Sequence, residues 1–404
     1  MRRLRGITLL LMWACANLAQ AGIVFTPHLS EYSRLPAGQY TELTFVTTEI
    51  EHVYNRDGKK VHLGAPFIPP GDSVDATLLL VKYLWVGNIF RDTGVPFLNT
   101  HPQFCRAIGV VGHQQATGNA VVRDRLAGQA SGTSGQGDVF GLCGLWTDEY
   151  RMGPVKLNGL WSGTVKFPVG RYDTDSLLNA GTHYWSYIPQ FAFHGEFWGR
   201  IYVDGTFAYQ INENNDTPSF GGLTPTRPAD VRNAEINLAW KFTEHWFADL
   251  GYSWRESVGP NYFDKVTLNL KDQPLPPTTA CATSAGTVIG PVPDNLCNSA
   301  ENFYLKPRPG PYQDAGIQGT LVTAGVYYIY RTSTVLQARV AVPVKGRGSQ
   351  LDVTYDVYTR DPRTNPTAAP ISNLISRLHG VQEAAAVSAS PFLELRMVYL
   401  FWAP

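Results

Sequence analysis

Residues 234–255 read AEINLAWKFTEHWFADLGYSWR, and apolar side chains take almost every second position on both sides of a break near residue 244. Polar residues, among them Glu235, Asp249 and Arg255, lie between them. A period of two predicts a strand with one apolar and one polar face, because successive side chains point to opposite faces. The stretch therefore predicts two consecutive antiparallel β-strands.

The same alternation recurs around residues 200–211, 336–342 and 393–401. Several of these runs hold the pattern for about nine residues, whereas strands of soluble proteins have about five or six. A strand that spans a bilayer needs roughly nine to eleven. Trp, Tyr and Phe lie near the ends of the apolar faces, as in the aromatic girdles of membrane barrels. The pattern favours a transmembrane barrel over a soluble sandwich.

The connections between the predicted strands alternate between short and long. Outer-membrane barrels have an even number of strands, short periplasmic turns and long outer loops. We therefore predict an all-β fold, an antiparallel up-and-down transmembrane β-barrel of about 12 strands, with long extracellular loops at 258–314 and 345–389. The predicted strands lie near 40–54, 75–90, 104–112, 137–149, 157–168, 182–194, 200–213, 230–243, 246–257, 315–331, 334–344 and 390–402.

The second long loop has patterns of its own. Alternation over 351–357 predicts an extended segment inside the loop. Farther along, Ile371, Leu374, Ile375 and Leu378 have the spacing of one helix face, which predicts a short surface helix.

The first 21 residues have the pattern of a secretory signal peptide, with three arginines, a short apolar stretch and Ala19-Gln20-Ala21. The alternative, a lipoprotein signal ending at Cys15, is disfavoured because Trp13 stands where a small residue is expected. Residues 22–404 then form a single barrel domain. Residues 22–39 precede the first strand and could fold inward as a plug.

Composition narrows the partners and the location. The 404 residues carry 33 basic and 33 acidic side chains, so a basic footprint for nucleic acid is lacking and no nucleic-acid partner is expected. After the signal, no apolar run reaches the ~18 residues of a transmembrane helix. We expect an exported chain that resides in the bacterial outer membrane, with the lipid bilayer as its solvent.

In such a barrel the polar face of each strand lines the lumen, and the charged residues there are the candidate site residues. Both signs of charge occur, and because unpaired buried charges are costly we expect most of them to pair with one another. The candidates are Arg200, Asp204, Glu235, Lys241, Asp249, Arg255, Arg339, Glu394 and Arg396.

Four cysteines remain after the signal, and an exported protein meets an oxidising compartment. Cys281 and Cys297 lie close together in a Pro- and Thr-rich stretch, which predicts a local disulfide rather than a zinc site. Cys105 and Cys143 fall nearly opposite each other if their strands form a hairpin. A cross-strand disulfide and two free thiols both remain open for this pair.

Several short motifs point to a family. They are Gly137-Asp138, residues 166–173 (KFPVGRYD), residues 177–181 (LLNAG), residues 184–186 (YWS) and residues 188–191 (IPQF). In this order they resemble the outer-membrane family associated with the meta-pathway of phenol degradation. Val169 and the large 258–314 loop depart from the family pattern. The resemblance implies a channel for hydrophobic compounds, without identifying the compound.

The last strand ends in Tyr399-x-Phe401, which resembles the signal that the barrel-assembly machinery reads, although three further residues follow. This machinery is therefore an expected partner.

The leading functional hypothesis is an outer-membrane channel through which small hydrophobic compounds, aromatic ones among them, diffuse by the lumen or by a lateral gap. The alternative is a structural or adhesive barrel that binds an external partner through its long loops. The sequence contains neither G-x-S-x-G nor H-E-x-x-H. We therefore predict no enzyme activity, no metal and no cofactor; a triad assembled from distant residues is the third alternative.

Overall fold

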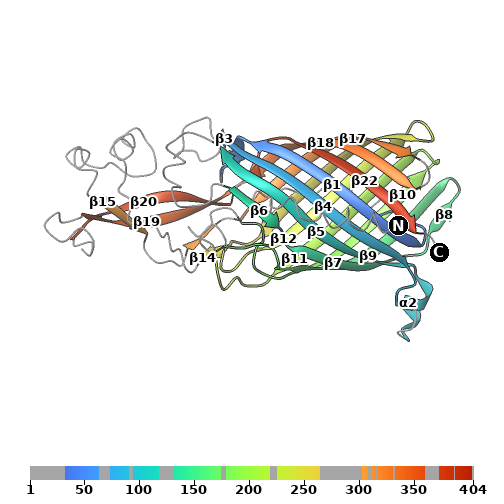
Figure 1. Ribbon diagram of the computed structural model, residues 1–404, viewed down its shortest axis with the longest axis horizontal. Helices are drawn as coiled ribbons and strands as arrows, with labels where there is room; N and C mark the ends of the chain where they lie inside the picture. Colours follow the sequence, from blue (N-terminus) through green and yellow to red (C-terminus); the bar gives the residue numbers. More distant parts are fainter. Residues whose placement is uncertain are drawn as a thin grey trace, which may run out of the picture.

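The computed structural model describes residues 32–62, 73–90, 94–117, 132–173, 179–218, 225–263, 303–307, 312–314, 316–330, 333–359, 373–385 and 387–402. Its body is a long barrel with a narrower projection at one end (Figure 1). The predicted signal peptide, residues 22–31 of the predicted plug, Cys281 and Cys297 lie outside the described residues.

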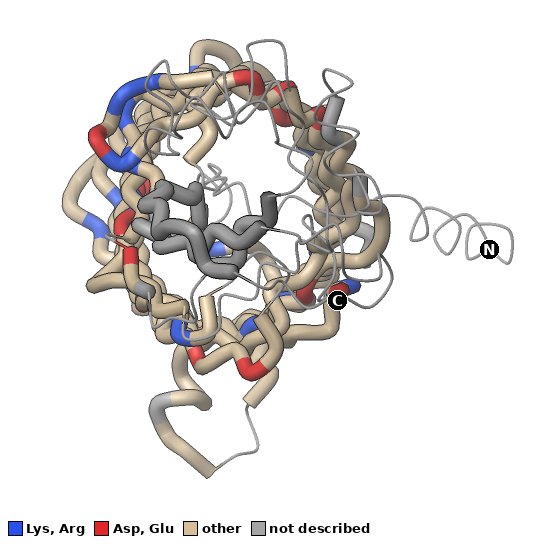
Figure 2. The backbone as a smooth tube through the Cα atoms, turned by 90° about the vertical axis from the view of Figure 1, so that its left-hand side faces the viewer, with Lys and Arg blue, Asp and Glu red and all other residues tan. Residues whose placement is uncertain are grey.

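Twelve antiparallel strands close into one barrel, which confirms the predicted fold class. Each strand pairs with its neighbours in chain order, β22 pairs with β1, and Figure 2 shows the resulting ring. The barrel strands are β1 (Gly38–Ile50), β4 (Ser73–Gly87), β5 (Gln103–Thr117), β7 (Val139–Trp146), β9 (Val155–Phe167), β10 (Ser186–Phe197), β11 (Ile201–Asn212), β12 (Asp230–Lys241), β13 (Trp246–Val258), β17 (Gln318–Tyr330), β18 (Thr334–Arg347) and β22 (Phe392–Trp402).

The two ends of the barrel differ. One end holds the start of β1, the end of β22, the short helix α2 (Pro96–Thr100) and the hairpin strand β8 (Tyr150–Met152) (Figure 1). We call this the periplasmic end, and the opposite end, which carries the long loops, the outer end. Three small elements lie at the outer end: β6 (Gly132–Gln136), which pairs with β5; the pair β14 (Tyr262–Phe263) and β16 (Tyr312–Gln313); and the sheet of β2 (His52–Tyr54), β3 (Lys60–His62) and β21 (Val387–Ser388).

The projection is a three-stranded sheet of β15 (Phe303–Pro307), β19 (Ser349–Thr359) and β20 (Asn373–Ala385) (Figure 1). The extended segment expected over 351–357 lies in β19. The expected helix is wrong, because Leu374, Ile375 and Leu378 lie in β20; Ile371 is outside the described residues. The reason is that β20 pairs with β19 along its length, with two irregularities in the register, and this ladder outweighs the helical spacing of a few apolar residues.

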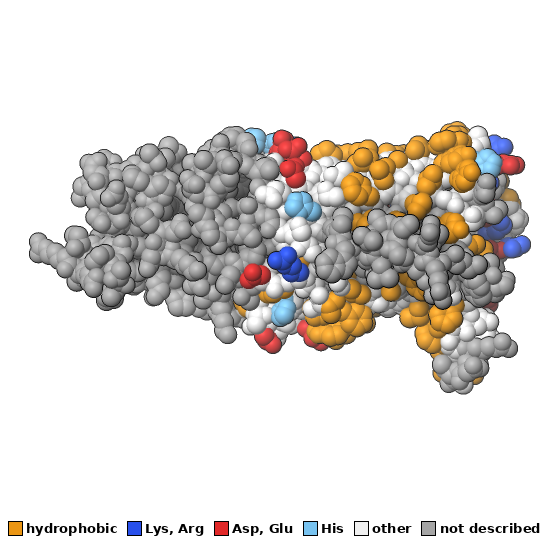
Figure 3. Space-filling model, in the orientation of Figure 1, with side chains coloured by type: hydrophobic (Ala, Val, Ile, Leu, Met, Phe, Trp, Pro, Cys, Tyr) orange, Lys and Arg blue, Asp and Glu red, His pale blue; other side chains and the backbone are white. Residues whose placement is uncertain are grey.

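The outer surface of the barrel is apolar over a broad band (Figure 3). Leu250 is 60% exposed and Trp240 57%, values that no soluble core strand would have. Near the periplasmic end, the rings of Trp246 and Tyr328 lie 4.7 Å apart, as part of an aromatic girdle. This band is the face that the lipid covers.

The interior is less uniformly polar than the alternation suggested. β4 is apolar on both faces: Leu78 and Leu80 are buried inside, whereas Tyr83 and Trp85 are exposed. Two apolar clusters therefore fill parts of the lumen, one around Leu78 and Phe392 and one around Phe104 and Trp146. A small barrel is narrow enough for side chains to fill it. Among the described residues, no helix is long and apolar enough to span a membrane.

Candidate functional site: a cavity inside the barrel

A cavity of about 370 Å³ lies inside the barrel, and it has two unlike sides. On one side, β4, β5 and β7 contribute an apolar wall. Its residues are Leu78, Leu80, Ile108, Val110, Phe140 and Leu142. Lys82 of β4 and Arg106 of β5 also line the cavity. The volume lies in the range of small-molecule sites, roughly 300–1,000 Å³.

The other side of the cavity is polar and comes mainly from β9 to β13. Its amides, hydroxyls and charges belong to Ser162, Thr164, Lys166, Gln190, Thr206, Gln210, Asn233, Glu235 and Arg255. An apolar wall facing a polar one gives the cavity the character of a site for a molecule with two unlike ends.

On the periplasmic side, Tyr32 of the segment before β1 borders the cavity. Tyr32 is buried, and its backbone carbonyl accepts hydrogen bonds from Trp146 Nε1 at 3.2 Å and from Asn158 Nδ2 at 3.5 Å. Its neighbours in the apolar cluster include Phe104 and Leu160, which also line the cavity. Within the described part of the expected plug segment, Tyr32 thus lies inside the wall, whereas Arg34, Pro36 and Ala37 are exposed.

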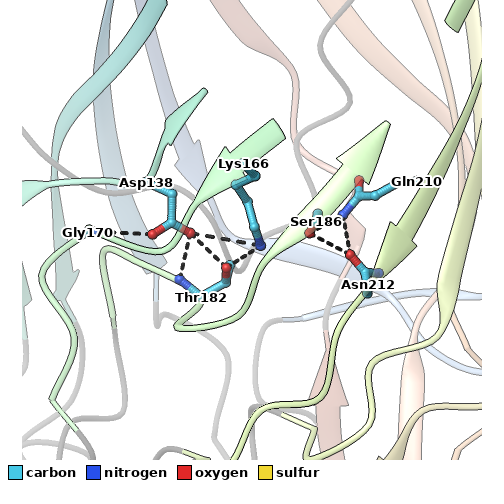
Figure 4. A network of polar contacts seen from close by, with 7 residues as sticks. All are labelled: Asp138, Lys166, Gly170, Thr182, Ser186, Gln210 and Asn212. Atoms are coloured by element: carbon cyan, nitrogen blue, oxygen red, sulfur yellow. Dashed lines mark hydrogen bonds and ion pairs between the residues drawn. The ribbon is translucent and has the colours of Figure 1, made fainter. Parts of the chain in front are cut away.

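At the outer end, Asp138 fastens the β9–β10 loop (residues 168–185) to the barrel (Figure 4). Asp138 Oδ1 accepts from the Gly170 amide at 3.1 Å. Oδ2 accepts from the amide and hydroxyl of Thr182, at 2.9 and 2.7 Å. Lys166 Nζ lies 3.9 Å from the same oxygen and donates to Thr182 Oγ1. We call this set the Asp138 latch.

The latch needs glycine at two loop positions because the backbones touch. A Cβ on Gly170 would lie 2.7 Å from both the Gly137 carbonyl carbon and Gly181 Cα. A Cβ on Gly181 would lie 2.8 Å from Asp138 Oδ1. The motif residues Gly137, Asp138, Gly170 and Gly181, far apart in sequence, therefore form one tightly packed point.

The latch brings the loop into the mouth of the cavity, where Ala180, Thr182 and Tyr184 line it. Lys166 Nζ lies 3.6 Å from the centre of the Tyr184 ring, a cation–π contact. Loss of solvation raises the pKa of Tyr184 to about 12, so its hydroxyl stays neutral at physiological pH.

A second polar group, also drawn in Figure 4, orients the cavity side chain Gln210. Gln210 Nε2 donates to Asn212 Oδ1 at 2.8 Å, and Ser186 Oγ donates to the same oxygen at 2.7 Å. Asn212 is held in turn through its backbone N–H, which donates to Asp230 Oδ1 at 3.0 Å. The polar wall is thus pre-organised by its own hydrogen bonds.

Most of the predicted lumen charges lie inside the barrel. Arg339 and Asp249, both fully buried, form an ion pair that Tyr327 extends through its hydroxyl, 3.3 Å from Arg339 Nη2. Asp204, also fully buried, lies 2.7 Å from His194 Nδ1.

Arg396 donates to Glu42 at 2.7 Å, and Glu42 also pairs with Lys82 at 2.7 Å. We call these three residues the lumen triad. Glu394 is buried in the strand next to Arg339.

Glu235 and Arg255 line the cavity, and Lys241 lies at the periplasmic end with Nζ 5.7 Å from the Phe247 ring centre. The prediction that Arg200 lines the lumen is wrong. The residue is exposed in the β10–β11 turn, after Trp198 and Gly199, whose φ angles are 52° and 65°. The alternation had been extended one residue too far, into a turn that leaves the barrel wall.

Among the described residues, the sequence patterns missed six ionisable residues of the interior: Glu42, Lys82, Arg106, Asp138, Lys166 and His194. Parts of the strands that carry Glu42 and Lys82 are apolar on both faces. A period-two pattern therefore could not show which face of these strands points into the lumen. Asp138 and Lys166 could have been found, because both belong to the quoted motifs.

A disulfide joins Cys105 and Cys143 across β5 and β7, where the two residues are direct partners in the ladder. Their Cα atoms are 4.1 Å apart. The neighbouring residues Phe104 and Trp146 point inward, and Cys143 is exposed, so the bond lies on the lipid side of the wall. Of the two possibilities open from the sequence, the structure has the disulfide.

The closed ring, its apolar belt and its filled lumen define an outer-membrane β-barrel. The model of the family described as "Putative MetA-pathway of phenol degradation" matches residues 64–266, and the chain belongs to this family. No curated protein matches the sequence.

Among solved structures, the chain is similar to the COG4313 outer membrane channel from Pseudomonas putida F1, with a TM-score of 0.55 and 13% identity over 94% of this chain and 100% of the other. A FadL homologue of Pseudomonas aeruginosa gives a TM-score of 0.33 at 12% identity, covering 95% and 96% of the two chains. The P. putida toluene transporter TodX gives 0.31 at 10%, covering 90% of each. At these identities the first likeness shows the fold.

Proposed function

We propose that the protein is a channel through which small hydrophobic compounds, aromatic ones among them, diffuse across the bacterial outer membrane. The observation that carries the proposal is the cavity, which has an apolar wall of six side chains inside a barrel whose wall is complete. A purely hydrophilic pore would have no use for such a wall. The family's association with phenol degradation supports the same substrate class.

The route through the barrel has two compartments. A second cavity of about 150 Å³ lies on the periplasmic side, lined by residues such as Leu35, Tyr40 and Leu400. Lys82 and Arg106 line both cavities. A compound that enters from outside must therefore pass the lumen triad and the Tyr32 segment, or leave sideways through the wall. We propose that the Tyr32 segment moves during passage.

An uptake assay in a porin-deficient Gram-negative host tests the channel. Cells that express the protein should take up radiolabelled toluene faster than cells without it. Ile108→Trp would fill the apolar wall and should abolish the gain. The control is Val340→Trp, at a lipid-facing position that is 48% exposed, and it should leave uptake unchanged. Equal uptake by the Ile108→Trp variant and the parent protein would contradict a route through this cavity.

The second candidate function is an adhesive or structural barrel that binds an external partner. The projecting sheet of β15, β19 and β20 favours it, because the sheet lies beyond the barrel at the outer end (Figure 1). Deleting residues 349–385 should abolish attachment of cells to surfaces while toluene uptake persists. Unchanged attachment would count against this function.

A further inference from the structure

Four cations line the cavity among the described residues, and they differ in how they are compensated. Lys82 pairs with Glu42 at 2.7 Å, and Lys166 lies 3.9 Å from Asp138 and donates to Thr182. Arg106 also interacts with another residue, so it is not without a partner. Arg255 stands apart: its side chain is half-buried, its Nε is buried without a hydrogen-bond partner, and Tyr184 and Glu235 act on it through electrostatic attraction.

Arg255 lies beside the polar wall of the cavity, where a ligand could contact its guanidinium group. It lies on β13 opposite Asn233 of β12, and Asn233 and Gln210 line the same polar wall. Among the residues that line the cavity, the acid nearest in the ladder is Glu235, and Tyr184 also lines the cavity. The lining contains four cations against two acids, Asp138 and Glu235; because Glu42 compensates Lys82 from just outside the lining, a surplus of one positive charge remains.

Placing a cation in a partly dry cavity without a hydrogen-bonded counter-charge is costly, and a bound anion offsets part of that cost. Guanidinium presents its N–H groups as a planar fork that matches both oxygens of a carboxylate. The neighbouring side-chain amide of Asn233 can donate to the same group. Across the cavity, the wall of Leu80, Ile108 and Phe140 offers apolar surface to a hydrocarbon body.

We propose that Arg255 is a ligand-binding residue and that the cavity takes amphipathic monocarboxylates, with the carboxylate at Arg255 and the hydrocarbon on the apolar wall. The proposal rests on the proposed channel function and specifies its substrate class. Aromatic acids and short fatty acids share this chemistry, and the volume of about 370 Å³ accommodates either.

Equilibrium dialysis on the full mature chain in lipid nanodiscs tests the proposal. The ligands are radiolabelled benzoate and octanoate, compared with benzyl alcohol and octanol as neutral counterparts. The parent protein should bind the carboxylates more tightly than the alcohols. Arg255→Gln should weaken carboxylate binding about ten- to a hundredfold, the range for hydrogen bonds to a charged group. Its binding of the alcohols should stay unchanged.

Two further variants keep the result interpretable. Arg255→Lys retains the charge but loses the fork, so it should bind carboxylates with intermediate affinity. Arg232→Gln changes an arginine on the neighbouring strand that is exposed and paired with Glu256, and it should bind like the parent. Heat-modifiable mobility on a gel shows that each variant has folded.

The outcomes separate the two proposals. Equal binding of benzoate and benzyl alcohol by the parent, or carboxylate binding unaffected by Arg255→Gln, overturns the role of Arg255 and leaves the channel standing. Absence of binding by all four ligands, together with absent toluene uptake in cells, overturns the channel itself. Whether benzoate or octanoate binds more tightly decides between the aromatic and aliphatic members of the class.

Discussion

Replacing Asp138 by alanine should free the β9–β10 loop while the barrel stays closed. The carboxylate accepts three hydrogen bonds from the loop, at 3.1, 2.9 and 2.7 Å. Hydrogen bonds to a charged group contribute about 1.5–3 kcal/mol each. Three at the lower value sum to about 4.5 kcal/mol, which corresponds to a shift in the opening equilibrium on the order of a thousandfold. Loss of the acid also leaves Lys166 without its counter-charge.

Hydrogen–deuterium exchange measured by mass spectrometry on the nanodisc-embedded protein reads out this opening. Peptides that contain Gly170 and Thr182 should exchange about a thousandfold faster in Asp138→Ala, while peptides from β12 and β13 should not change. The matched control is Asp314→Ala, which removes a carboxylate that holds a different outer segment through the Asn261 and Gly316 amides, at 3.0 and 2.6 Å. Unchanged exchange of the β9–β10 loop in Asp138→Ala would refute the latch.

Three further predictions concern stability and assembly, each measured on purified protein. Gly170→Ala should destabilise the fold by about 1–3 kcal/mol in a urea titration, because the new Cβ meets backbone, whereas Gly163→Ala, with nothing within 4 Å, should be neutral. Asp249→Ala should cost about 3–5 kcal/mol because it removes the hydrogen-bonded counter-charge of buried Arg339. Asp249→Leu combined with Arg339→Met should recover only part of that loss, because buried Glu394 in the neighbouring strand then loses its cation; a double variant as unstable as the single one would contradict this reasoning. Cys105→Ser combined with Cys143→Ser should lose about 4 kcal/mol, the chain-entropy value for a separation of 38 residues, and mass spectrometry of the unreduced parent should find the bond.

The sequence was sufficient for the barrel because lipid imposes a strict rule on it. Every spanning strand must present apolar side chains outward, so residues such as Leu250, Trp240 and Val340 repeat with a period of two. The same rule made the position of Cys105 opposite Cys143 predictable, because strand register follows from the alternation and the turn.

The interior obeys a weaker rule, and there the predictions were less complete. The lumen accepts both apolar and polar side chains, so Leu78 and Leu80 fill it while Glu42 and Lys82 pair inside it. The latch depends on contacts between residues that are far apart in the chain, which alternation does not encode. The helix predicted in the outer projection was wrong for another reason. A few apolar residues at helical spacing cannot outweigh pairing with a neighbouring strand, and Leu378 pairs with Tyr355 in β19.

The covalent bond between β5 and β7 has a consequence for how the chain reaches the membrane. It closes a ring of backbone that runs from Cys105 to Cys143 and includes the loop between them. Thiols are oxidised in the periplasm, before a barrel inserts. Once oxidised, these two strands can no longer enter one after the other as a linear thread; they must be handed to the bilayer together, as a preformed pair.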